Sequence, residues 1–144
     1  MQTQIKDDFE KDKADLITIV REMTESASGI ESTKHWAKDA LWFDIPPFAS
    51  KGIAPAIKMF DSVFKSFKSC KIIILNTEVI ISNELGVVCT VQKAEIVFQN
   101  DISKTLFIRE TDCFKKLNDN WQLFHQHASV PTGEWDGKII SDVG

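Results

Sequence analysis

The chain has 144 residues, of which 43% are hydrophobic and 26% are charged. This composition is typical of a globular domain rather than a disordered chain, and the length allows a core without stabilising disulfides or metals. The net charge of −4 argues against nonspecific binding to nucleic acid, which needs clustered Lys and Arg.

The chain lacks the signals of a membrane or secreted protein. No apolar run approaches the roughly 18 residues that span a bilayer. The N-terminal segment has acidic residues where a signal peptide is basic and then apolar. Cys70, Cys89 and Cys113 are odd in number and lack close spacing, which argues against a disulfide framework or a zinc knuckle. We therefore expect a cytoplasmic protein without membrane or nucleic-acid partners.

The first part of the chain has the apolar spacing of helices. A first helix is predicted from Phe9 to Ala27, and Gly29 ends it. A second, shorter helix is predicted to begin with Ser32 as its cap, to carry Trp36, and to end near Asp39.

A short strand and a third helix are predicted next. The apolar run from Leu41 to Ile45 indicates a strand that enters a loop at Pro46 and Pro47. A helix is predicted after Gly52. Its apolar stripe, interpreted as core packing rather than a cofactor site, consists of Ile53, Ile57, Phe60, Phe64 and Phe67.

The second half of the chain has the composition of β structure. Four segments rich in β-branched and aromatic residues predict strands at 72–81, 87–98, 105–117 and 121–130. The short breaks between them favour an antiparallel meander, because parallel pairs need long crossovers. Helices followed by a long antiparallel sheet predict an α+β fold.

The three predicted helices can cover only one face of this sheet. If the sheet bends strongly around them, it forms a cone with an open mouth. We expect one domain over residues 1–144, with a core at about 8–132 and a short C-terminal tail in which Trp135 packs over the sheet or a dimer seam rather than as a pocket lid. Both faces of the strand at 87–98 are half apolar, which favours a homodimer packed sheet to sheet.

Asp44 is the first candidate for chemistry. It lies among Trp42, Phe43, Ile45 and Phe48, and apolar surroundings raise the pKa of a carboxyl towards the range useful for proton abstraction. The alternative is that Asp44 accepts backbone N–H bonds as the cap of a proline-containing loop.

The last strand carries the second candidate, His125-x-His127-x-Ser129, whose side chains share one face about 6.6–6.8 Å apart. The loop 118–120 fits a three-residue hairpin with Asn120 in the left-handed conformation. The resulting register pairs Cys113 with His125, Thr111 with His127, and Arg109 with Ser129. A slip of one residue would replace Arg109 and Thr111 by Glu110 and Asp112 on that face.

Three interpretations of this patch remain open. The histidines can be structural and bonded to the neighbouring strand. The patch can line a pocket for a small polar or anionic ligand, with Arg109 as the anion partner. A His-x-His metal site lacks a third ligand fixed by spacing, so we expect neither metal nor cofactor.

The segments DALWFDIPPF-x-x-KG and RETDCFKKLNDNWQLFHQHASVP resemble the SnoaL-like branch of the nuclear-transport-factor-2-like superfamily, over roughly residues 8 to 132. The resemblance implies a cone-shaped, cystatin-like roll around a pocket. The end of the chain is also similar to the association domain of calcium/calmodulin-dependent protein kinase II, which assembles into rings. Ketosteroid isomerases of this superfamily use an aspartate base, which Asp44 matches, whereas their Tyr donor has no counterpart because the chain contains no Tyr.

These observations lead to two functional hypotheses. In the first, the protein is an isomerase, dehydratase or cyclase that removes a proton next to a carbonyl. Its catalytic residues would be Asp44, His125 and His127, and its ligand-binding residues Trp42, Phe60, Arg109, Thr111 and Ser129. In the second, the domain is a non-catalytic module for ligand binding or oligomerisation.

Overall fold

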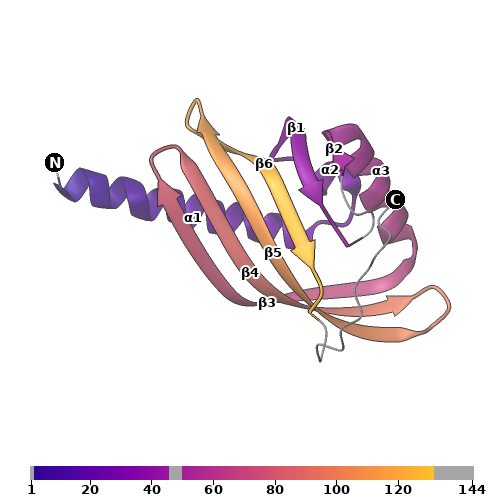
Figure 1. Ribbon diagram of the computed structural model, residues 1–144. Coiled ribbons are helices and arrows are strands. Elements are labelled where there is room, and N and C mark those ends of the chain that lie inside the picture. Colours follow the sequence, from indigo (N-terminus) through magenta and orange to yellow (C-terminus); the bar gives the residue numbers. More distant parts are fainter. Residues whose placement is uncertain (1, 46–49, 132–144) are drawn as a thin grey trace, which may run out of the picture.

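The computed structural model of the protein describes residues 2–45 and 50–131 (Figure 1). The expected loop at Pro46 and Pro47, the neighbouring Phe48 and the expected packing of Trp135 lie outside the described residues. The elements are α1 (Gln2–Glu25), α2 (Gly29–Ser32), β1 (Trp36–Phe43), β2 (Ser50–Lys51), α3 (Ile53–Lys65), β3 (Phe67–Ser82), β4 (Leu85–Phe98), β5 (Ser103–Leu117) and β6 (Asn120–Ser129).

The strands form one sheet in the order β2-β1-β6-β5-β4-β3. The four long strands, β3 to β6, form the predicted antiparallel meander. They bend strongly around the helices, as Figure 1 shows. This confirms the predicted α+β fold with a curved sheet. The sequence did not predict that β1 extends this sheet by pairing in parallel with β6.

The second helix was predicted too far along the chain. Ser28, not Ser32, is the cap, because its hydroxyl accepts the backbone N–H of Glu31. Trp36 belongs to β1, where it is 4% exposed on the core side. The helix was predicted from Ser32 as a cap and from Trp36 and Ala37 as apolar positions, but pairing with β6 makes this segment a strand.

The third helix is confirmed after Gly52, whose φ of 97° is a conformation that favours glycine. It ends at Lys65, so that Phe67 opens β3 instead of closing the helix. Within residues 2–45 and 50–131, no helix is both long and apolar enough to cross a membrane.

The core fills only part of the space inside the curved sheet. Leu16 and Val20 of α1 pack with Val88, Phe114 and Leu123 of the sheet, and each of these side chains is at most 1% exposed. The helix approaches the sheet closely here, because a Cβ added at Gly86 would lie 2.7 Å from Leu16 Cδ1. Beyond this packed region, towards the C-terminal end of α1, the inner face of the sheet is free to line a cavity.

The turn between β5 and β6 differs from the prediction, although the register does not. Asn118 and Asp119 form a two-residue turn with φ of 51° and 62°, as in a type I′ hairpin. Phe124 is an extra residue on β6, where the register shifts next to Cys113. This bulge restores the predicted pairs Cys113–His125, Thr111–His127 and Arg109–Ser129.

Candidate functional site

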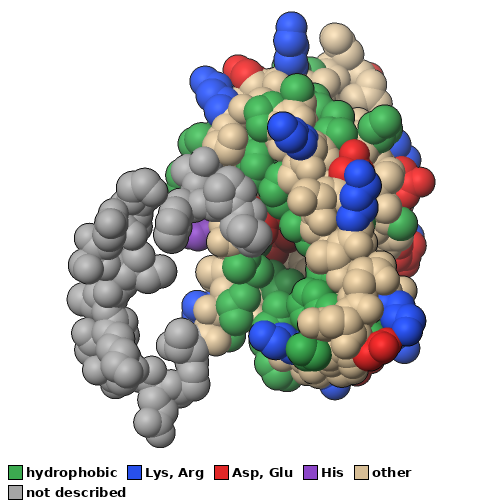
Figure 2. Space-filling model, turned by 90° about the vertical axis from the view of Figure 1, so that its right-hand side faces the viewer, with side chains coloured by type: hydrophobic (Ala, Val, Ile, Leu, Met, Phe, Trp, Pro, Cys, Tyr) green, Lys and Arg blue, Asp and Glu red, His purple; other side chains and the backbone are tan. Residues whose placement is uncertain are grey.

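A cavity of about 780 Å³ lies between the inner face of the sheet, α3 and the C-terminal end of α1. Figure 2 looks into its opening, where hydrophobic side chains form the rim and acidic side chains lie inside. Most of its wall is apolar and includes Met23, Met59, Phe60, Val63, Phe64, Phe67, Ile72, Ala94, Ile96, Phe98, Leu106 and Ile108. This is the size and character of a site for a small organic molecule.

Strand alternation decides which polar side chains reach this cavity. On β4, β5 and β6, the residues facing inward include Gln92, Glu110 and Gln126. Gln92 lies opposite Ile108 and next to Glu110 in the ladder, while Asp112 pairs with Gln126. The inner face therefore gathers carboxyl and amide groups at one place in an otherwise apolar wall.

Asp44 reaches the same cavity from the end of β1. One of its carboxylate oxygens accepts the backbone N–H of Ile45 at 2.6 Å. Burial raises the pKa of Asp44, and the bond from Ile45 opposes this shift only in part. Asp44 therefore lines the cavity, as the first interpretation requires, while the proline-containing loop that it was expected to cap lies outside the described residues.

Glu110 and Asp112 form a coupled carboxyl pair on the inner face of β5. Gln126 donates to Asp112 Oδ1 at 2.9 Å, and Gln92 donates to Glu110 Oε2 at 3.3 Å. Asp112 is fully buried, and its Oδ2 has no hydrogen-bond partner among the described residues. A proton held between the two carboxyls would satisfy this oxygen.

Burial is the main cause of the unusual acidity of this pair. It raises the pKa of Asp112 to about 6, with the nearby Cys89 and Asp44 adding to the shift. The pKa of Glu110 is raised well above its usual value by burial first, then by the charge and proximity of Asp112 and by Asp44. Two carboxyls this close cannot easily both ionise, so the pair retains a proton near neutral pH.

The polar patch on β5 and β6 lies on the opposite face from the cavity. His125, His127, Arg109, Thr111 and Ser129 alternate with the inward residues and do not line the cavity. The expectation that Asp44 and the histidines project into one hollow is therefore wrong. The pairing of the strands was predicted correctly, but pairing alone does not tell which face the helices cover.

The histidines on this outer face have structural contacts. The Phe43 ring lies 5.1 Å from the His125 ring and 5.4 Å from the His127 ring, both edge to face. His125 Nδ1 donates to the carbonyl of Leu41 at 2.9 Å. His125 and His127 therefore link β6 to its parallel neighbour β1.

The two remaining predicted ligand contacts have different positions. Phe60 lines the cavity, as expected. Trp42 is 1% exposed in the core, where its indole N–H donates to the carbonyl of Gly52 at 3.1 Å.

No group of three His, Cys, Asp or Glu side chains in the described part of the chain is arranged to hold a metal ion.

The sequence contained a signal for the residues that were missed. The alternative face with Glu110 and Asp112 was considered, but only as the result of a register slip. Gln92 and Gln126 were not identified, although each lies on the same side of its strand as buried apolar residues. A buried glutamine side chain needs a hydrogen-bond partner, and here each glutamine donates to a carboxyl group.

The model of the SnoaL-like domain family matches residues 15–133 of the chain. No protein with a curated description matches the sequence. Solved structures with the same fold include a candidate scytalone dehydratase from Novosphingobium aromaticivorans, with 13% identity and a TM-score of 0.79 over 88% of this chain and 89% of that one.

Two further structures show how widely the fold is used. A hexachlorocyclohexane dehydrochlorinase from Novosphingobium barchaimii has 11% identity and a TM-score of 0.77, covering 87% of this chain and 90% of the other. A candidate calcium/calmodulin-dependent protein kinase II association domain from Xanthomonas campestris has 13% identity and a TM-score of 0.70, covering 86% and 88%. At these identities the likeness concerns the fold alone.

Proposed function

Because the chain belongs to the SnoaL-like domain family, we propose that it is an enzyme that binds a small, mostly apolar carbonyl compound in its cavity and removes a proton next to the carbonyl. Asp44 is the base. The observation that carries this proposal is the presence of two carboxyl groups in one apolar cavity, Asp44 directly after β1 and Glu110 on β5. Enzymes of small-molecule acid–base chemistry use such pairs in distinct roles.

The environments of the two carboxyls support this division of roles. Burial raises the pKa of Asp44, which makes its ionised form a stronger base than an exposed aspartate. Glu110 shares its surroundings with Asp112, so that one proton remains on the pair. The protonated pair can donate a hydrogen bond to an oxygen that gains negative charge.

The reaction would proceed in two steps. Asp44 takes the proton from the carbon next to the carbonyl, and the C–H electron pair forms a C=C bond as the carbonyl becomes an enolate. The enolate oxygen accepts a hydrogen bond from Glu110, the member of the carboxyl pair that lines the cavity, when Glu110 carries the proton. If the substrate also carries a C=C bond next to the α-carbon, Asp44 returns the proton to the far carbon of that bond, the carbonyl re-forms and the double bond has moved. If it carries a β-hydroxyl group, the carbonyl re-forms, the enolate electrons form the new C=C bond, and the C–O bond breaks; the hydroxyl leaves with its electron pair and takes the proton from Asp44 as water. The neighbouring dehydratase and dehydrochlorinase folds are consistent with an elimination of this kind.

Hydrogen–deuterium exchange tests this proposal without knowledge of the natural substrate. We expect the protein to accelerate exchange at the α-carbons of 4-phenylcyclohexanone in D₂O, as followed by NMR. Asp44→Asn should reduce the enzymatic exchange by about 10²–10⁴-fold, the usual contribution of a positioned base. Thermal melting would verify that the variant is folded. Exchange at the rate of the wild type in this variant would refute the role of Asp44.

The outer face of the sheet favours a second function, assembly into a homodimer. Ile80, Val91 and Phe107 lie on this face and remain 62%, 36% and 46% exposed. Exposed apolar side chains on one sheet face are typical of a surface that a second copy covers. We expect a dimer in sedimentation velocity at micromolar concentration and a shift to monomer in Phe107→Glu. A monomeric wild-type protein would contradict this assembly.

A further inference from the structure

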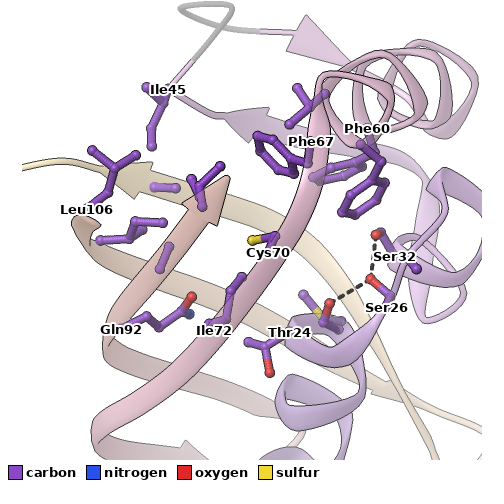
Figure 3. Close-up of a pocket in the computed structure, with 18 of the residues that line it drawn as sticks. Thr24, Ser26, Ser32, Ile45, Phe60, Phe67, Cys70, Ile72, Gln92 and Leu106 are labelled. Atoms are coloured by element: carbon purple, nitrogen blue, oxygen red, sulfur yellow. Dashed lines mark hydrogen bonds between the residues drawn. The ribbon is translucent and has the colours of Figure 1, made fainter. Parts of the chain in front are cut away.

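A pair of serine hydroxyls lies at the other end of the cavity from Gln92. Ser26 follows α1 and Ser32 ends α2, and both line the cavity wall. Figure 3 shows this pair on the helical side and Gln92 on the side of the sheet, with Cys70 and Ile72 drawn between them and Phe60 and Phe67 above. The cavity therefore has two polar ends separated by apolar side chains.

The hydrogen bonds of this pair determine what it can offer to a ligand. Ser26 Oγ donates its one hydrogen to the carbonyl of Met23 at 2.7 Å. The 2.6 Å contact between the two hydroxyls must therefore use the hydrogen of Ser32. Both hydrogens are committed to protein acceptors, so that only lone pairs face the cavity.

The hydroxyl oxygen of Ser32 accepts no hydrogen bond from the described residues, although its hydrogen is donated to Ser26. Ser32 is 5% exposed, and none of the hydrogen bonds within residues 2–45 and 50–131 brings a donor to its Oγ. A buried hydroxyl oxygen that accepts nothing is an open position for a donor. At the other end of the cavity, the ionised Asp44 is also an acceptor, whereas Glu110 can donate when it carries the proton of the carboxyl pair.

The charges around the cavity narrow the class of ligand further. The residues that line it include three acidic side chains, Glu25, Asp44 and Glu110, and only one basic one, the exposed Lys71. Its described lining has no Arg or His that could pair with a carboxylate or phosphate. An anionic ligand would meet the carboxylates of Glu25 and Asp44, with only the solvent-exposed Lys71 among the described lining residues to offset them.

We propose that Ser26 and Ser32 form a second binding subsite, which accepts a hydrogen bond from a hydroxyl group at the far end of an uncharged, elongated substrate. This inference rests on the proposed function, because the carbonyl of the same molecule lies at the carboxyl end of the cavity. The substrate class is therefore a neutral, apolar hydroxy-ketone.

Two matched ketones test the subsite in the full-length protein. The probes are 4-(4-hydroxyphenyl)cyclohexanone, which can donate at its far end, and 4-(4-methoxyphenyl)cyclohexanone, which cannot. Calorimetry should show that the hydroxyl compound binds on the order of ten-fold tighter, which corresponds to one hydrogen bond. In Ser32→Ala this preference should fall below about three-fold. The proposal would be overturned if the methoxy compound bound with an affinity equal to or higher than that of the hydroxyl compound, or if neither compound bound.

Two further variants make the outcome independent of folding and of catalysis. Ser32→Cys nearly preserves the shape of the side chain but is a weak acceptor, so it should lose the preference as well. Ser82→Ala removes an exposed hydroxyl at the end of β3 and should keep it. In Asp44→Asn the preference should persist although exchange is lost. A preference that survives in both Ser32 variants refutes the subsite, whereas unchanged exchange in Asp44→Asn refutes only the base.

Discussion

The inner and outer faces of the strands β4, β5 and β6 carry different chemistry, although their residues alternate along the same sequence. The inner face has Gln92, Glu110, Asp112 and Gln126, which are wholly or partly buried and bonded to one another. The outer face has the histidines and Arg109 beside exposed apolar side chains. The difference teaches that burial, rather than the type of residue, decides where chemistry becomes possible, because burial is the largest cause of the raised carboxyl pKa values on the inner face.

The packed part of the inner face should be the most sensitive to truncation. Phe114 is completely buried between α1 and the sheet, whereas Phe107 on the outer face is 46% exposed. We expect Phe114→Ala to reduce the free energy of unfolding by about 3–5 kcal/mol, because it leaves a cavity in the core. Phe107→Ala should cost less than about 1 kcal/mol in the same denaturant titration at a concentration where the protein is monomeric. Equal losses would show that both faces are packed.

The buried carboxyl pair should make stability depend on pH in a direction opposite to that of most carboxyls. The pKa of Asp112 is raised to about 6 in the folded protein. The folded state therefore holds a proton that the unfolded chain releases near pH 4, and this contribution to stability is lost as the pH rises through 6. Asp112→Asn cannot ionise, and its amide can still accept from Gln126.

We therefore expect Asp112→Asn to be more stable than the wild type by about 3 kcal/mol at pH 7.5, and this difference to shrink to about 1 kcal/mol at pH 4.5. Thermal unfolding at the two pH values measures this difference. Glu78→Gln, on the exposed outer side of β3, is the matched control and should change stability little at either pH. A variant that loses stability at pH 7.5 would contradict the interpretation of the pair.

The fold could be predicted from the sequence further than the site could. The enrichment in β-branched and aromatic residues identified all four long strands, and the polar breaks gave the positions of the turns between them, because these signals are local. The parallel pairing of β1 with β6 was not predictable, since it depends on a contact between distant segments. It also explains the error at Trp36, where tertiary pairing replaced an expected helix.

The site required one fact that no local pattern contains, namely which face of the sheet the helices cover. The pairs Thr111–His127 and Arg109–Ser129 were predicted correctly, yet the face was assigned wrongly. Burial of the neighbouring Phe114 and Leu123 on the inner side settles this assignment. Asp44 was identified because its apolar neighbours are adjacent to it in the sequence. Glu110 could be assigned to the cavity only from the tertiary structure, which shows the face of β5 that turns inward.

The smallest effect is expected from His127, one of the two histidines that the sequence suggested as catalytic residues. His127 lies on the outer face, exposed and in contact with the Phe43 ring, and the sheet separates it from the cavity. His127→Gln should change α-carbon exchange by less than about three-fold, because it removes neither the base nor the carboxyl pair that faces the substrate. Measuring both variants in the same assay compares the contributions of the outer and inner faces to the rate of α-carbon exchange. A loss in His127→Gln comparable to that in Asp44→Asn would mean that the outer face takes part in the chemistry, and the division between the two faces would then have to be abandoned.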